Sequence, residues 1–182
     1  MERIIRSVRR GELAATLDFV EKVFTDSEGE EEGRTVRRLV AEIRSKRYYL
    51  PELDLVMVNE RDEIIGHVMF SRFHIEGRYE DELLILTPMS VKTEFQRQHI
   101  SKELIEYGFE RAIELGYKVC MVEGNPQNYR ARGFVTSARY GIIADESVHL
   151  PHPDCMMVKE LVPGALKGVH GYVNYKMYDT LT

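Results

Sequence analysis

The segment from Leu83 to Phe109 constrains the fold of this 182-residue chain most, because it predicts a strand, a break, a turn and a helix in direct succession. The unbroken apolar run from Leu83 to Leu86 is typical of a strand that is covered on both faces. Pro88 lacks a backbone N–H, and a central strand tolerates that loss mainly at a bulge. The helix that follows carries one apolar stripe, formed by Ile100, Leu104, Gly108 and Ala112. We therefore expect a central strand that splays near Pro88.

The polar turn between Val91 and this helix predicts an anion site. A turn that runs straight into a helix leaves backbone N–H groups without partners, at the positive end of the helix dipole. Lys92, Arg97 and Lys102 add side-chain charge around the turn. The expected ligand carries phosphates.

A second buried strand should lie parallel to the first. The helix is expected to end near Gly116, and the segment from Lys118 to Glu123 then reads as a strand. This strand, helix, strand order predicts two parallel neighbours. The bulge at Pro88 would separate them at their C-terminal ends, and the resulting gap is the predicted cleft.

The rest of the chain predicts further strands with helices beside them. Antiparallel pairing is expected between the segments 53–58 and 64–75 because only a short polar turn joins them. An edge strand should include Ile4, Ile5 and Val8, and a last strand residues 155–158. Residues 169–178 are expected to form either an edge strand or a tail that faces a partner, such as a second copy in a homodimer. Apolar stripes predict two more helices, through Leu13, Leu17, Val20 and Phe24 and through Val36, Leu39, Val40 and Ile43.

An acidic segment, Asp26 to Gly33, is expected to form a loop between these two helices. Two interpretations stay open. In the first, the segment is solvated surface, as charged segments usually are. Alternatively, the carboxylates form the rim of an acceptor site and attract an amine cation.

Composition excludes several classes of protein. The 25 Lys and Arg residues against 30 Asp and Glu residues give a net charge of −5, which argues against a nucleic-acid binder. No apolar run approaches the ~20 residues that span a membrane. The charged N-terminal residues lack the apolar core of a secretion signal, so we expect a cytoplasmic protein. Cys120 and Cys155 have no metal-ligand spacing, and no metal is expected. Residues 1–182 are expected to form a single domain.

Two motifs give the chain a family resemblance. The run from Leu86 to Ser101 resembles the signature of the GNAT superfamily of acyl-CoA-dependent N-acyltransferases, in which Gln/Arg-x-x-Gly-x-Gly/Ala opens the helix. Gln96 fits the first position, His99 replaces the first glycine and Ser101 replaces the second small residue. The segment from Gly124 to Phe134 is similar to the Tyr-x-x-x-Gly-Phe element of the family, with a spacing like that of small predicted bacterial N-acetyltransferases.

The resemblance implies a fold and a cofactor. The fold is α/β (α+β), with a mixed, mostly antiparallel sheet flanked by helices and two parallel strands splayed at the bulge. The co-substrate is acetyl-CoA, and the second substrate is an amine acceptor. Pantetheine would pair with the strand at Met89 to Val91, and the backbone of Ser90 would stabilise the oxyanion. The residues assigned to the cofactor are Met89, Ser90, Val91, Gln96, Arg97, Gln98, His99, Ile100, Ser101, Lys102 and Asn125.

Tyr129 is the expected general acid, because it occupies the tyrosine position of the second motif. A phenol stays protonated at neutral pH and can give its proton to a departing thiolate. A tyrosine at a strand-helix junction is otherwise most often a core aromatic. Glu123 and His74 are the candidates for the general base, although structural roles are common for both residue types.

Three functions remain open from the sequence. The first is an N-acetyltransferase that moves an acetyl group from acetyl-CoA to a primary amine of a small molecule or peptide. The second is a catalytically weak acyl-CoA sensor with the same fold. The third is a nucleotide-binding protein. This hypothesis is weakened because the chain has neither a GKS/GKT phosphate loop nor an intact Gly-x-Gly-x-x-Gly.

Overall fold

A seven-stranded sheet organises the computed structural model, which describes residues 2–182. The strand order is β1-β2-β3-β4-β5-β8-β6, and every neighbouring pair is antiparallel except β4 and β5. The predicted mixed, mostly antiparallel sheet is therefore confirmed. The strands are β1 (Ile4–Ser7), β2 (Asp54–Val58), β3 (Ile64–Arg72), β4 (Leu83–Val91), β5 (Val119–Glu123), β6 (Val135–Thr136) and β8 (Met156–Glu160).

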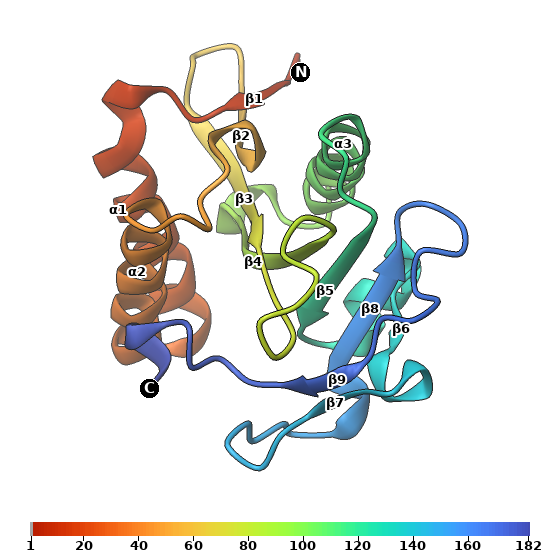
Figure 1. Cartoon of the computed structure of the whole chain (residues 1–182). Coiled ribbons are helices and arrows are strands. Elements are labelled where there is room, and N and C mark those ends of the chain that lie inside the picture. The colour runs from red at the N-terminus through yellow and green to blue at the C-terminus, as the bar shows by residue number, and fades with distance from the viewer. Residues whose placement is uncertain (1) are drawn as a thin grey trace.

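Helices cover both faces of this sheet, as Figure 1 shows. One face packs against α1 (Leu13–Glu28) and α2 (Glu30–Arg44), and the other packs against α3 (Ile100–Glu114). The expected stripe of α3 is buried, including Leu104 and Ala112. Gly66 of β3 permits this packing, because a Cβ there would lie 2.8 Å from Leu104 Cδ1. No helix within residues 2–182 combines the length and apolar character needed to cross a bilayer.

The predicted splay lies where β4 passes Pro88. The register between β3 and β4 shifts from Val68 opposite Met89 to Phe70 opposite Leu86, so Thr87 and Pro88 of β4 stand against Met69 alone and β4 carries one extra residue. Pairing between β4 and β5 runs from Leu83–Val119 to Ile85–Met121 and stops there. Beyond Ile85, the edge of β4 that faces β5 has no strand partner within residues 2–182.

The prediction of a loop at Asp26 to Gly33 is wrong, because this segment is helical except at Gly29. Gly29 has φ +100° and separates α1 from α2 within a single residue. Glu30, Glu31 and Glu32 form the first turn of α2, where carboxylates are stabilised by the positive end of the helix dipole. Gly33 is buried against α1, since a Cβ there would lie 2.7 Å from the carbonyl oxygen of Glu21.

The C-terminal region forms a separate small sheet before it returns to α2. In this sheet β9 (Gly171–Val173) pairs in parallel with β7 (Ile142–Ala144). The chain then crosses to α2, and the C-terminus lies beside that helix (Figure 1). Val173 and Tyr178 are each 1% exposed. Of the predicted strand over residues 169–178, only Gly171–Val173 forms one, in a separate sheet, and residues 173 and 178 pack into their own chain.

A buried ionic cluster ties α2 to the sheet. Asp54 is fully buried and accepts hydrogen bonds from Arg44 Nε at 2.9 Å and from the Tyr49 hydroxyl at 2.7 Å. His67 Nε2 lies 2.7 Å from Asp54 Oδ1. Burial opposes the charged form of Asp54, but the His67 hydrogen bond and the charge of Arg44 outweigh it and hold the pKa of Asp54 below its usual value.

Candidate functional site

The turn that leads from β4 into α3 uses two left-handed backbone positions. After a 3-10 turn at Thr93–Phe95, Arg97 has φ +64° and His99, the N-cap of α3, has φ +63°. Glycine adopts this conformation without steric cost, which accounts for the glycine that the family motif has at position 99. His99 adopts the same conformation with an exposed side chain.

Three backbone N–H groups are free at the start of α3. The N–H of Glu103 donates to the His99 carbonyl at 3.0 Å, as expected for the first intrahelical bond. Within residues 2–182, the N–H groups of Ile100, Ser101 and Lys102 have no acceptor. Free amides and the positive end of the helix dipole together favour an anion at this point.

A cleft of about 660 Å³ opens beside two of these residues, Ile100 and Ser101. Most of the predicted binding residues line it, whereas Gln98, Lys102 and Asn125 do not. Gln98 instead turns its carbonyl oxygen toward Arg3, whose Nη1 donates to it at 3.2 Å. Sequence reasoning missed Phe24, Asn128 and Arg132, which also line the cleft and belong to segments outside the first motif. The predicted residues that do line it are Met89, Ser90, Val91, Gln96, Arg97, His99, Ile100, Ser101 and Tyr129.

The open edge of β4 presents the amides of Met89 and Val91. The N–H of Lys92 donates to Ile65 of β3 at 2.9 Å, and N–H groups of successive strand residues point to opposite edges. The N–H of Ser90, which pairs with His67 of β3, therefore points toward β3. Ser90 does line the cleft, but its amide is directed away from the open edge. The amide beside the bulge that can meet a ligand is that of Met89.

A second cleft of about 540 Å³ adjoins the first. The two clefts share Phe24, Glu28, Met89, Asn128 and Tyr129 in their walls. Three carboxylates from different elements line the second cleft, and they are those of Glu28, Glu32 and Glu123. Burial, together with the charges of Glu28 and Glu31, raises the pKa of Glu32. This electrostatic environment favours a cation.

Tyr129 stands at the junction of the two clefts. It ends the short helix α4 (Pro126–Tyr129), which Asn125 caps by accepting the N–H of Gln127 at 3.0 Å. The predicted cofactor residue Asn125 thus lines the second cleft and holds the helix that carries Tyr129. The Tyr129 ring packs edge-on against Phe134, with centroids 5.8 Å apart.

The Tyr129 hydroxyl is a protonated, unpaired donor. Within residues 2–182 it has no hydrogen-bond partner, although the residue lines both clefts. Burial, reinforced by Cys120, raises the pKa of Tyr129 to about 12. The phenol therefore keeps its proton at neutral pH.

The two base candidates have different positions. Glu123 ends β5, is exposed and lines the second cleft, where its Oε1 accepts the hydroxyl of Tyr175 at 2.7 Å. His74 lies outside both clefts, and its Nδ1 accepts the N–H of Gly77 at 3.1 Å within a turn. No cluster of three or more His, Cys, Asp or Glu side chains in the described part of the chain could hold a metal ion.

Comparison with known proteins agrees with this geometry. Residues 17–139 match the profile of the Acetyltransferase (GNAT) family. The uncharacterized N-acetyltransferase YhbS of Escherichia coli K12 is 28% identical over 140 residues, which cover 76% of this chain and 79% of YhbS.

Solved structures of GNAT proteins share the fold. A crystal structure of YhbS from Escherichia coli in complex with CoA has a TM-score of 0.83 at 22% identity, covering 96% of this chain and 90% of that one. A GNAT acetyltransferase from Brucella melitensis in complex with acetyl-CoA has a TM-score of 0.72 at 23% identity, covering 96% of each chain. Because the family profile spans more than half of the sequence, this chain belongs to the GNAT family of acetyltransferases.

Proposed function

We propose that this acetyltransferase moves the acetyl group of acetyl-CoA directly to a primary amine of a cationic small molecule or peptide. The observation that carries the proposal is the meeting of two clefts at Tyr129 and Met89. One cleft has the free amides that suit phosphates, and the other has the carboxylates that suit an ammonium group. A donor and an acceptor bound in these clefts would meet at the phenol.

The cofactor proposal uses the first cleft. YhbS has been solved with CoA and the Brucella protein with acetyl-CoA, and both share this fold. The pyrophosphate would lie on the amides of Ile100, Ser101 and Lys102, with the guanidinium groups of Arg97 and Arg132 beside it. The amides of pantetheine would pair with the open edge of β4 at Met89 and Val91.

The acceptor proposal uses the second cleft. Glu28 ends α1 and Glu32 lies in the first turn of α2, so two carboxylates of the acidic segment line the cleft. Their charges would attract a protonated amine and raise its local concentration. This supports the interpretation of the acidic segment as an acceptor rim, for those two residues.

The proposed reaction requires a base and an acid. A protonated amine first gives one proton to Glu123, directly or through water, and its nitrogen then attacks the thioester carbonyl. The N–H of Met89 stabilises the resulting oxyanion. The C–S bond breaks, and the thiolate takes the proton of Tyr129. The new amide nitrogen releases its remaining excess proton, which restores the phenol through solvent, so the net products are amide, CoA thiol and one proton.

The test combines titration and turnover. Isothermal titration with acetyl-CoA measures donor binding, and detection of free CoA thiol over a panel of primary amines measures transfer. Binding together with amine-dependent thiol release is the expected result. Binding without thiol release for any amine would instead favour an acyl-CoA sensor, and absence of binding would overturn both functions.

A further inference from the structure

The C-terminal segment lines the second cleft although it is far in sequence from both motifs. Tyr175, Tyr178 and Leu181 contribute to the cleft wall beside Glu123 and Pro88. The segment follows β9 and crosses the face of the molecule to reach α2 (Figure 1). Its position therefore decides the shape of the proposed acceptor site.

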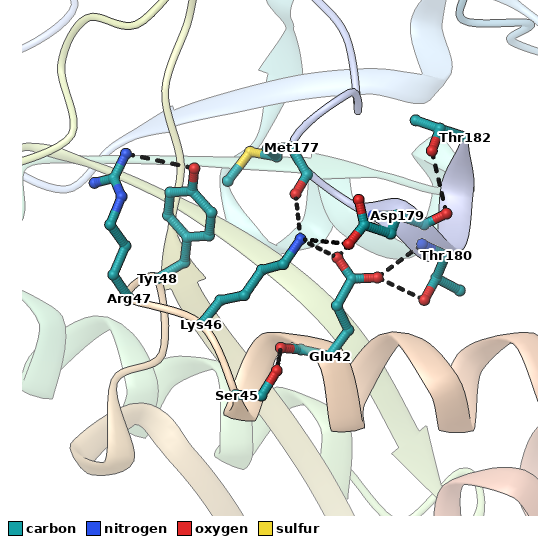
Figure 2. A network of polar contacts seen from close by, with 9 residues as sticks. All are labelled: Glu42, Ser45, Lys46, Arg47, Tyr48, Met177, Asp179, Thr180 and Thr182. Atoms are coloured by element: carbon teal, nitrogen blue, oxygen red, sulfur yellow. Dashed lines mark hydrogen bonds and ion pairs between the residues drawn. The ribbon is translucent and has the colours of Figure 1, made fainter.

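Two charged side chains hold this segment. Glu42 belongs to α2, and Lys46 follows the C-terminal end of that helix. Glu42 accepts the N–H of Asp179 at 2.8 Å, the N–H of Thr180 at 2.7 Å and the Thr180 hydroxyl at 2.6 Å. Figure 2 shows the contacts of Glu42 with Thr180 and Lys46. Lys46 Nζ donates to the carbonyl oxygen of Met177 at 2.9 Å and to Glu42 Oε2 at 2.7 Å. The segment is thus bound through its backbone as well as through side chains.

Glu42 is suited to this role because it is ionised and largely buried. Its side chain is 10% exposed. Burial opposes ionisation, but the hydrogen bonds from Lys46, Thr180 and Asp179 outweigh burial and lower the pKa of Glu42 to about 2. Hydrogen bonds to a charged group are stronger than those to a neutral one.

The other end of the segment reaches the proposed base. The Tyr175 hydroxyl donates to Glu123 Oε1 at 2.7 Å, and the Tyr175 ring lies 6.3 Å from that of Phe73 and 6.4 Å from that of Tyr178, between centroids. The aromatic group is therefore packed from two sides. A carboxylate fixed by such a donor keeps one orientation toward the cleft.

We propose that Glu42 is a positioning residue for the acceptor site: it fixes residues 177–180, and thereby places Tyr175, which packs against the buried Tyr178, as the wall that an acceptor amine contacts. This inference rests on the proposed function. Tyr175 acts as a specificity-determining residue, because its ring faces the apolar part of an acceptor and its hydroxyl orients Glu123. The acceptor class that fits is a cationic amine with an apolar or aromatic body, since aromatic residues and carboxylates line the same cleft.

The test compares Glu42→Gln and Thr180→Val with a control, Glu110→Gln, which changes an exposed glutamate of α3. Thiol release is measured with tyramine and with 1,4-diaminobutane as acceptors, and hydrogen exchange reports on the amides of residues 179 and 180. For Glu42→Gln we expect an acceptor KM raised about 10-fold, which corresponds to one weakened charge-assisted hydrogen bond. The KM for acetyl-CoA should stay unchanged, and Glu110→Gln should match the wild type.

Thr180→Val removes only the hydroxyl donor, so a smaller rise of the acceptor KM is expected, about 2- to 5-fold. It keeps the inference testable if Glu42→Gln does not fold. Faster exchange at residues 179 and 180 with an unchanged acceptor KM would overturn the inference while leaving the proposed function intact. A wild-type protein that binds acetyl-CoA but acetylates neither these amines nor any other would overturn the proposed function, and the inference with it.

Discussion

Tyr129 lies so close to Gly124 that a Cβ at position 124 would stand 2.6 Å from Tyr129 Cε2. Gly124 directly follows β5, and Phe134 packs against the same ring edge-on. The ring therefore fits between Gly124, which has no side chain to displace it, and the aromatic ring of Phe134. This arrangement fixes the direction of the phenol into the two clefts.

Gly124→Ala should displace the Tyr129 ring and reduce turnover. A misplacement of about 1 Å can lower a rate by about 10²-fold, so we expect kcat to fall at least 10-fold. Acetyl-CoA affinity, measured by titration, should stay the same because the amides of α3 are unaffected. The control is Gly11→Ala, since a Cβ at Gly11 meets no atom within 4 Å. An unchanged kcat for Gly124→Ala would show that the ring position does not matter for transfer.

Asp54→Asn should strongly destabilise the fold, because it leaves the Arg44 guanidinium without its buried counter-ion. Breaking a buried pair in this way typically costs about 3–5 kcal/mol in the free energy of unfolding. Urea denaturation measures this difference.

The same substitution should change the pH dependence of stability. The pKa of Asp54 is lower in the folded state than its unfolded value of about 3.9, so its contribution is present above about pH 4 and is lost as the pH falls through the folded value. The wild type should lose stability on acidification more steeply than Asp54→Asn does. Parallel pH profiles would contradict this role of the carboxylate.

His99→Gly should retain the fold and acetyl-CoA binding, because glycine adopts the left-handed backbone of position 99 freely. The comparison is His99→Val, since a β-branched residue at φ +63° is strained and should lower the free energy of unfolding by about 1–2 kcal/mol. Thermal denaturation of both variants provides the measurement. Equal melting temperatures would mean that position 99 relaxes out of this conformation.

Ser101→Glu should weaken acetyl-CoA binding, because it places a carboxylate beside the free amides of α3. Ser101→Gln is the matched neutral control for side-chain size. We expect a Kd about 10-fold higher for Glu than for Gln at low salt, with a smaller difference at high salt because screening weakens the repulsion. Identical Kd values for the two variants would show that the phosphates of acetyl-CoA do not bind at this turn.

Local patterns explain which parts of the site could be predicted from the sequence. The apolar run of β4, the Pro88 bulge and the stripe of α3 each depend on neighbours in the chain, and all three appear in the structure. The acidic segment misled the prediction because glutamates at a helix N-terminus resemble those of a solvated loop. In the structure the segment is helical on both sides of Gly29, whose φ of +100° separates α1 from α2.

Long-range polar contacts could not be predicted in the same way. Tyr175 donates to Glu123 across 52 positions, and Thr180 donates to Glu42 across 138 positions. No periodicity or motif relates such pairs, because the contacts exist only after the sheet and α2 are in place. The pair Tyr175 and Tyr178 near the end of the chain is a local sign that this segment packs against something, and Tyr178 is 1% exposed.

Single-turnover kinetics of Tyr129→Phe test the central claim most directly. Phenylalanine keeps the ring and its packing against Phe134, so the melting temperature and the acetyl-CoA Kd should match the wild type. The proton for the departing thiolate is lost, and general acid catalysis is typically worth about 10²- to 10⁴-fold. We therefore predict that the single-turnover rate of thiol release falls at least 10²-fold. A well-folded Tyr129→Phe protein that releases the thiol at the wild-type rate would contradict the assignment of Tyr129 as the acid.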